Sequence, residues 1–414
     1  MRSCAKVCQA VSFCILTLAV VLAASSQAAA QAVAREFIYT ANFADNTVSG
    51  FSLNPVTGSA TEVPGSPFGS GSGPFSITHS PDGRFLYAVM KAQVLGRPCG
   101  DSGNGELISY SVDPGTGALT LVDNVTLSGV CSGGVAVDPT GQFVYAASFP
   151  LEGPKVGIID GYQASNGHLT PLPGSPFASP LEVSFGQNPA ISEIAIPPNG
   201  EVLYASNPND SQGILIFDRD TTTGALTFRT GVDTGTSIGP MAITASGRFI
   251  LALGDFLTGS SGAPGVFEFA IGPHGDLTPV AGSPFSMTSG FGGAMAVSPN
   301  GEFVDVSVSG GSGGIDAFRR DARGRLSLAP GSPFTGSAPF AFALAFDPDG
   351  RFLVEAGEIL RSDRRTGALT HASDFTPGGF VQSLTVTRTC EEAAETDGKD
   401  DCGCHAREGE NGND

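Results

Sequence analysis

One carboxylate interrupts the internal repetition of this chain of 414 residues. Glu193 lies where the other copies of a repeated segment carry small or uncharged residues, namely Ser76, Gly134, Pro240, Ala294, Ala343 and Ser383. A lone carboxylate beside a channel can have a raised pKa and can activate water as a general base. The alternative is a structural acid that reaches solvent or a backbone amide, and the sequence alone favours this alternative.

Other residues could complete a site around such a base. Lys91 and Arg97 follow a predicted strand at 85–89, and a cation there could steady the negative charge on an oxygen under attack. Polar residues that follow equivalent strands are candidates for ligand binding: Asn42, Asp45, Asn207, Asp210 and Asp255. Binding residues often lie on loops, although polarity alone is weak support because most loops are polar.

Two further residues depart from their equivalents in the repeat. His79 stands where the other copies are apolar, and we expect a packed imidazole rather than a functional one. Asp305 replaces an aromatic residue, and its carboxylate would need a partner or water if it is buried. The structural interpretation is preferred for both residues.

The sequence gives no support for a metal or cofactor. Cys402, Cys404 and His405 offer three ligands in the tail, whereas a structural zinc site takes four. A disulfide within the tail or a free thiol is the preferred interpretation. The chain also lacks a P-loop and a His-Glu-x-x-His sequence, so we predict no cofactor and no metal site.

The elements that position these residues come from a repeat of a turn followed by a strand. Its copies read PDGRFLY at 81–87, PTGQFVY at 139–145, PNGEVLY at 198–204, ASGRFIL at 245–251, PNGEFVD at 299–305 and PDGRFLV at 348–354. The glycines of successive copies are 58, 59, 47, 54 and 49 residues apart. A period near 50 residues built from short strands is typical of β-propeller blades.

The repeats predict an all-β fold, a seven-bladed β-propeller with four-stranded blades. Seven copies fit between residues 35 and 389 if the opening phrase at 35–42 is counted. The series starts at the second strand of a blade and ends with a lone first strand at 382–387. We therefore expect residues 383–386 to pair beside residues 37–41 and to close the ring, which removes exposed sheet edges.

The ends of the chain have a different character from the repeats. Residues 1–32 have a basic start, an apolar run and small residues before a possible cleavage point, as in a signal peptide. Residues 33–389 form the propeller, and residues 390–414 form an acidic tail that we expect to be disordered. These features predict a secreted or periplasmic protein.

Export and charge limit the partners. In an oxidising compartment we expect a disulfide between Cys99 and Cys131, because both lie in connections predicted to emerge on the same face. The formal net charge of −19 argues against nucleic acid and, after signal cleavage, against an anionic membrane surface. A monomer that binds a small molecule, a carbohydrate-derived ligand or a protein at the channel face is expected.

The repeated phrases resemble the lactonase family of seven-bladed propellers, whose named member is a 6-phosphogluconolactonase. The similarity spans residues 35–389 and depends on residues 37–58, on residues 66–87 and on a recurring Gly-Ser-Pro-Phe. The resemblance implies hydrolysis of a cyclic ester by polar side chains at one end of the central channel, with His and Arg near the starts of the inner strands.

The inner-strand starts of this chain carry neither His nor Arg, so no catalytic residue is transferred from the family. Our first hypothesis is therefore an exported binding or interaction module without retained catalysis. The alternative is a lactone hydrolase in which Glu193 activates water and Lys91 or Arg97 stabilises the oxyanion.

Overall fold

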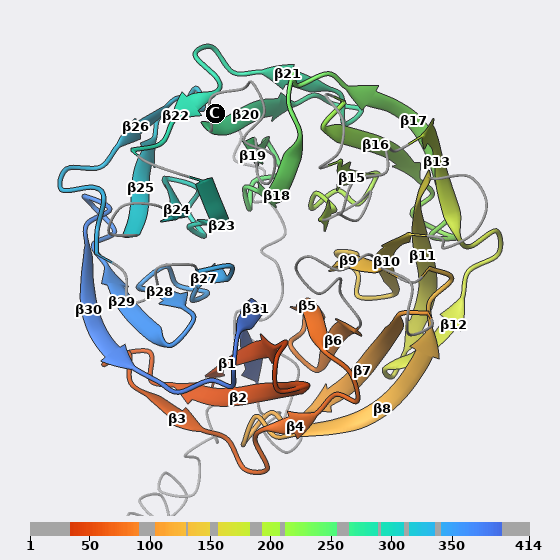
Figure 1. Ribbon diagram of the computed structural model, residues 1–414, viewed down its shortest axis with the longest axis horizontal. Helices are drawn as coiled ribbons and strands as arrows, with labels where there is room; N and C mark the ends of the chain where they lie inside the picture. The colour runs from red at the N-terminus through yellow and green to blue at the C-terminus, as the bar shows by residue number, and fades with distance from the viewer. Residues whose placement is uncertain are drawn as a thin grey trace, which may run out of the picture.

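The computed structural model describes residues 34–90, 104–129, 131–149, 156–182, 193–207, 212–254, 265–288, 291–309, 314–335 and 341–390. These residues form seven antiparallel sheets arranged as a ring around a central channel (Figure 1). The seven-bladed β-propeller predicted from the repeats is confirmed. The described part contains no helix of the length and hydropathy that a membrane span requires.

The first blade joins the two ends of the described chain. It contains β31(Val381–Cys390), β1(Ala34–Asn42), β2(Thr47–Leu53), β3(Ala60–Glu62) and β4(Phe68–Gly69). The strand β31 pairs with β1 in an antiparallel register that runs from Ala34↔Cys390 to Asn42↔Val381. The predicted pairing of residues 383–386 with residues 37–41 is therefore confirmed, and β31 extends one residue into the predicted tail.

The next three blades follow in chain order around the ring (Figure 1). The second blade has β5(Pro74–His79), β6(Phe85–Met90), β7(Glu106–Val112) and β8(Leu119–Thr126). The third has β9(Cys131–Val137), β10(Phe143–Phe149), β11(Val156–Ser165), β12(His168–Pro171) and β13(Phe177–Glu182). The fourth has β14(Ile194–Ala195), β15(Val202–Ser206), β16(Ile214–Arg219) and β17(Leu226–Val232).

The last three blades complete the ring. The fifth has β18(Ile238–Ile243), β19(Phe249–Gly254), β20(Gly265–Ile271), β21(Leu277–Pro279) and β22(Phe285–Ser286). The sixth has β23(Phe291–Val297), β24(Phe303–Ser309), β25(Gly314–Arg320) and β26(Leu326–Leu328). The seventh has β27(Leu344–Phe346), β28(Phe352–Glu355), β29(Glu358–Ser362) and β30(Leu369–Asp374). The innermost strand of each blade faces the channel, so residues at its start surround one mouth of that channel.

Neighbouring blades are joined by a repeated hydrogen bond from a buried tyrosine. The hydroxyl of Tyr39 on β1 donates to the Gly117 carbonyl in the second blade at 2.8 Å. Tyr145 and Tyr204 make equivalent bonds to glycine carbonyls of the following blades. Gly117 has a φ of 74°, and a Cβ atom there would lie 2.4 Å from the Phe37 ring. Only glycine allows this close approach between blades.

The Gly-Ser-Pro-Phe phrases have a common role beside the third strand of their blades. The hydroxyl oxygens of Ser66, Ser175, Ser283 and Ser332 each accept a backbone N–H from that strand. The phenylalanine that follows lies in a short strand or bridge paired with the same neighbour. The phrase thus brings the chain from the outer strand back toward the next inner strand.

Candidate functional site

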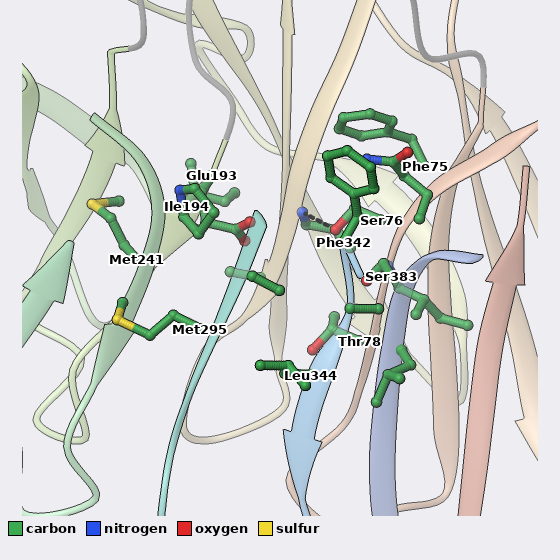
Figure 2. A pocket seen from close by; sticks show the side chains of 18 of the residues that line it. Phe75, Ser76, Thr78, Glu193, Ile194, Met241, Met295, Phe342, Leu344 and Ser383 are labelled. Atoms are coloured by element: carbon green, nitrogen blue, oxygen red, sulfur yellow. Dashed lines mark hydrogen bonds between the residues drawn. The ribbon is translucent and has the colours of Figure 1, made fainter. Parts of the chain in front are cut away.

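The central channel contains a pocket of about 380 Å³, lined by the inner strands of all seven blades. Glu193 lies directly before β14 and lines this pocket with five of the residues that share its repeat position: Ser76, Pro240, Ala294, Ala343 and Ser383. Figure 2 shows the Glu193 carboxyl group directed into the pocket, across from Ser76 and Phe342. The repeat comparison therefore identified a real ring of equivalent positions.

The Glu193 side chain is held between two neighbouring inner strands. The Ser206 hydroxyl accepts the backbone N–H of Glu193 at 2.9 Å, which fixes the start of β14 against β15. A Cβ atom added at Gly134 would lie 3.0 Å from the Glu193 Oε1 atom. The absence of a side chain at Gly134 therefore leaves room for the carboxyl group beside the third blade.

The environment of Glu193 changes its acidity. Burial in the pocket wall removes hydration from the carboxylate and raises the pKa of Glu193 to about 7. The backbone N–H of Ile194 opposes this shift by hydrogen bonding to the carboxylate. The group is thus close to half ionised at neutral pH, which suits a side chain that exchanges a proton with substrate or water.

Two serine hydroxyls in the same pocket have a proton to donate. Ser76 accepts the backbone N–H of Val135 at 3.3 Å, and Ser383 accepts that of Ile77 at 3.3 Å. Each bond crosses from one blade to the next and fixes the oxygen position. The structure gives neither hydroxyl proton an acceptor among the described residues. Both hydroxyls can therefore donate to a ligand in the pocket.

The other candidates from the sequence lie elsewhere or outside the described residues. Asn42 is fully buried, and its amide donates to the hydroxyls of Thr47 and Ser49 within its own blade, which is a structural role. Asn207 is also buried, with its backbone bonded to Gly213 and Ile238. Neither residue lines the central pocket.

Asp45 is the exposed member of the predicted binding group. Its carboxylate accepts the backbone N–H of Gly379 at 2.5 Å, so it joins the loop after β1 to the segment before β31. The remaining candidates, Lys91, Arg97, Cys99, Asp210 and Asp255, lie outside the described residues, as does the side chain of Cys131. The predicted signal peptide and the tail beyond Cys390 lie outside them as well.

His79 and Asp305 are both outside the pocket lining. The Nδ1–H of His79 donates to the Ser80 carbonyl at 2.8 Å, and burial lowers the pKa of this imidazole, so the structural interpretation fits. Asp305 is 1% exposed, and its Oδ1 atom has no hydrogen-bond partner among the described residues. We expected a partner or water for Asp305, and the described residues supply no partner for this atom. Burial raises the pKa of Asp305 well above its usual value, and protonation removes the charge instead.

A second group of carboxylates converges at the ring closure. Oxygens of Glu36, Asp347 and Asp349 lie within 4.8 Å of one another. Arg388 donates to Glu36 at 2.5 Å and contacts Asp349 at 2.8 Å, and Arg351 pairs with Asp349. The arginines supply the positive charge that a metal ion would otherwise provide, so we interpret this group as an ion-pair network.

Sequence reasoning missed a group of phenylalanines at the channel mouth. Phe75 and Phe342 line the pocket. The ring of Phe342 lies 5.6 Å from that of Phe380, which in turn lies 6.4 Å from that of Phe43. We call Phe43, Phe75, Phe342 and Phe380 the aromatic rim. The sequence did contain a signal for this group, because the inner-strand starts at 73–75 and 379–381 each include a phenylalanine.

Comparisons with known proteins agree with this architecture. Residues 38–167 match the family described as lactonase, 7-bladed beta-propeller. A search of curated protein sequences finds no match.

Solved structures with the same fold cover most of the chain. A candidate 6-phosphogluconolactonase from Bacteroides uniformis aligns with a TM-score of 0.70 at 18% identity, over 85% of this chain and 99% of its own. One from Bacteroides fragilis gives 0.69 at 17% identity, over 85% and 98%. The periplasmic gluconolactonase PpgL of Pseudomonas aeruginosa gives 0.69 at 17% identity, over 86% and 99%. Residues 38–167 thus resemble the lactonase family of seven-bladed β-propellers, and the described chain shares its fold with these solved structures.

Proposed function

We propose that this protein hydrolyses a lactone in the central pocket, with Glu193 as the general base. The observation that carries the proposal is a carboxyl group in the channel wall whose pKa is raised to about 7. A base with a pKa near the working pH combines a useful ionised fraction with enough basicity to accept a proton. The match of residues 38–167 to the lactonase family supports the same reaction class.

The reaction is the addition of water to a cyclic ester. Ionised Glu193 removes a proton from water as the water oxygen attacks the lactone carbonyl carbon. The hydroxyls of Ser76 and Ser383 donate to the oxyanion that forms, since their protons are available and their oxygens are fixed by backbone amides. Protonated Glu193 then returns the proton to the ring oxygen as the carbon–oxygen bond breaks. The product is an open-chain hydroxy acid.

A second candidate is a binding module without catalysis. It is favoured by one observation: among the described residues of the pocket lining, Glu193 is the only charged side chain, so none of them is a cation. Oxyanion stabilisation would then depend on neutral donors, which are weaker than charged ones. A ligand could occupy the same pocket without being hydrolysed.

A lactone-hydrolysis screen separates the two candidates. The mature protein is incubated with five- and six-membered lactones, and acid release is followed in weak buffer. We expect turnover that falls by 10² or more in Glu193→Gln, an order of magnitude typical of general bases. Glu62→Gln is the matched control, because Glu62 is exposed on the outer strand β3. Saturable lactone binding without turnover would favour the binding module.

We also propose that the protein acts outside the cytoplasm as a monomer and takes a small molecule, such as a carbohydrate-derived ligand, at the channel face. The support is the signal-like sequence at 1–32, together with the periplasmic location named for the Pseudomonas aeruginosa protein of the same fold. Amino-terminal sequencing of protein from the exported fraction tests this proposal. A start near Val33 is expected, and an intact Met1 in the cytoplasmic fraction would contradict it.

A further inference from the structure

The lining of the central pocket combines apolar side chains with polar groups. Eight aliphatic or thioether side chains that also pack into the cores between blades contribute to it: Ile77, Val135, Val137, Ile194, Met241, Met295, Leu344 and Leu384. Figure 2 places Met241 and Met295 on the side of Glu193. Methionine side chains adapt to ligands of irregular shape. The described wall therefore offers a ligand both apolar contacts and polar partners.

The charge of the described pocket lining disfavours anionic ligands. The only charged side chain of the described lining is Glu193, and ionisation makes it negative. A phosphate group beside it would gain no cation from the described lining in exchange for the hydration that it loses, and the ionised carboxylate would repel it. An uncharged ligand avoids both costs.

The aromatic rim adds an apolar surface at the mouth. The Phe380 side chain is 41% exposed, which is unusual for a phenylalanine. Its backbone has a φ of 49°, a conformation that non-glycine residues rarely adopt. The structure thus keeps an exposed ring in a strained position, and such strain is most common at functional sites.

The position of Phe380 is set by contacts with the loop after β1. The backbone N–H of Phe43 donates to the Phe380 carbonyl at 3.0 Å, and that of Ala44 to the Gly379 carbonyl at 3.3 Å. Asp45 accepts the Gly379 N–H from the other side of the loop. Three hydrogen bonds therefore hold the rim in place before any ligand arrives, which reduces the ordering cost of binding.

We propose that the pocket takes an uncharged lactone that carries a hydrocarbon substituent, with the lactone ring at Glu193 and the substituent against the aromatic rim. This inference rests on the proposed function in one respect, because it takes the ligand to be a lactone. The pocket volume of about 380 Å³ lies within the range of small-molecule sites. The aromatic rim then determines which lactone is preferred.

The test measures binding separately from turnover. Calorimetry with Glu193→Gln, which should not hydrolyse the ligand, compares δ-valerolactone, δ-octalactone and δ-decalactone with glucono-δ-lactone and its 6-phosphate. We expect affinity to rise about fourfold for each added methylene until the pocket is filled. The phosphorylated lactone should bind at least tenfold more weakly than glucono-δ-lactone. Tighter binding of the phosphate, or affinity that is independent of chain length, would overturn the inference.

Variants of the rim identify where the substituent lies. Phe380→Ala removes an exposed ring and keeps a non-glycine residue at the same φ, so it should fold; affinity for δ-decalactone should fall roughly two- to tenfold. Phe342→Leu should act in the same direction. Leu121→Ala is the control, because Leu121 is 60% exposed on the outer strand β8. Equal losses in the control and the rim variants would contradict the proposed placement.

The two proposals fail in different ways. If Glu193→Gln binds alkyl lactones with the expected selectivity but the unmodified protein does not hydrolyse them, the proposed hydrolysis is wrong and the ligand class stands. If glucono-δ-lactone 6-phosphate is both bound and hydrolysed best, hydrolysis stands and the ligand class is wrong. If no lactone of the series binds, both are wrong.

Discussion

Replacing Arg388 by methionine should destabilise the propeller in a manner that depends on pH. Arg388 lies on β31 directly opposite Glu36 of β1, so the ion pair spans the two strands that close the ring. Its guanidinium donates to Glu36 at 2.5 Å and contacts Asp349 of the seventh blade at 2.8 Å. The substitution keeps a long apolar side chain and removes only the charge and the donors.

The magnitude follows from burial. The Glu36 side chain is 2% exposed and that of Arg388 is 21% exposed. Removing one partner of a buried ion pair costs about 3–5 kcal/mol, and the partial exposure of Arg388 favours the lower end. We therefore expect a loss of about 3 kcal/mol in the free energy of unfolding at pH 8. This is a large part of the stability of an ordinary domain.

The pH dependence follows from the carboxyl groups left behind. Burial already raises the pKa of Glu36, and the hydrogen bond from Arg388 opposes that rise. Without Arg388 the folded-state pKa of Glu36 rises further above its unfolded value. The folded variant then retains a proton that the unfolded chain has lost, so its stability falls as pH rises through this interval. Below the unfolded pKa the carboxyl is neutral in both states, and the loss should be about 1 kcal/mol or less.

Urea unfolding followed by circular dichroism at pH 3.5 and pH 8 measures both values. Arg84→Met is the control, because Arg84 is an exposed turn residue. Adding Glu36→Gln to Arg388→Met should recover part of the loss at pH 8, since it removes the unpaired charge. An equal loss at both pH values, or no recovery in the double variant, would refute the reasoning.

Three other outcomes test the fold and its buried groups. Deleting residues 381–414 removes β31 and should lower the melting temperature far more than deleting residues 390–414; equal effects would reject the ring closure. Burial raises the pKa of Asp305, so the parent protein loses stability as pH rises above about 4. Asp305→Asn lacks this titration and should become more stable relative to the parent over the same pH interval. Thermal melts measured across this pH range would show no such trend if the reasoning is wrong. Peptide mapping without reduction should find Cys99 linked to Cys131, a bond that would stabilise the fold by roughly 3 kcal/mol; recovery of both as alkylated thiols would contradict the pairing.

The ring closure could be predicted from sequence because the first and last blades were each incomplete. In the predicted blades, residues 37–41 had no strand on their inner side and residues 383–386 had no strand on their outer side. The alternation of apolar residues indicated that both segments are strands. The ties between blades could not be predicted in this way. The Tyr39 hydroxyl and the Gly117 carbonyl are 78 residues apart, and their contact depends on how adjacent sheets pack.

The site was predicted only in part, for a related reason. The position of Glu193 followed from its place in the repeat, since equivalent residues must surround one channel. The rim did not follow, because Phe43 and Phe380 approach each other only when the ring closes. Polarity alone was misleading at Asn42, whose amide is used by hydroxyls of its own blade.

The central claim is that Glu193 acts as a general base in lactone hydrolysis, and its direct test is the pH dependence of kcat/KM. Because burial raises the pKa of Glu193 to about 7, the ionised base should accumulate as pH rises through 7. The rate should therefore increase with a midpoint near pH 7 and level off above it, after subtraction of the Glu193→Gln background. A profile without this midpoint, or a Glu193→Gln variant that retains the parent rate, would contradict the account.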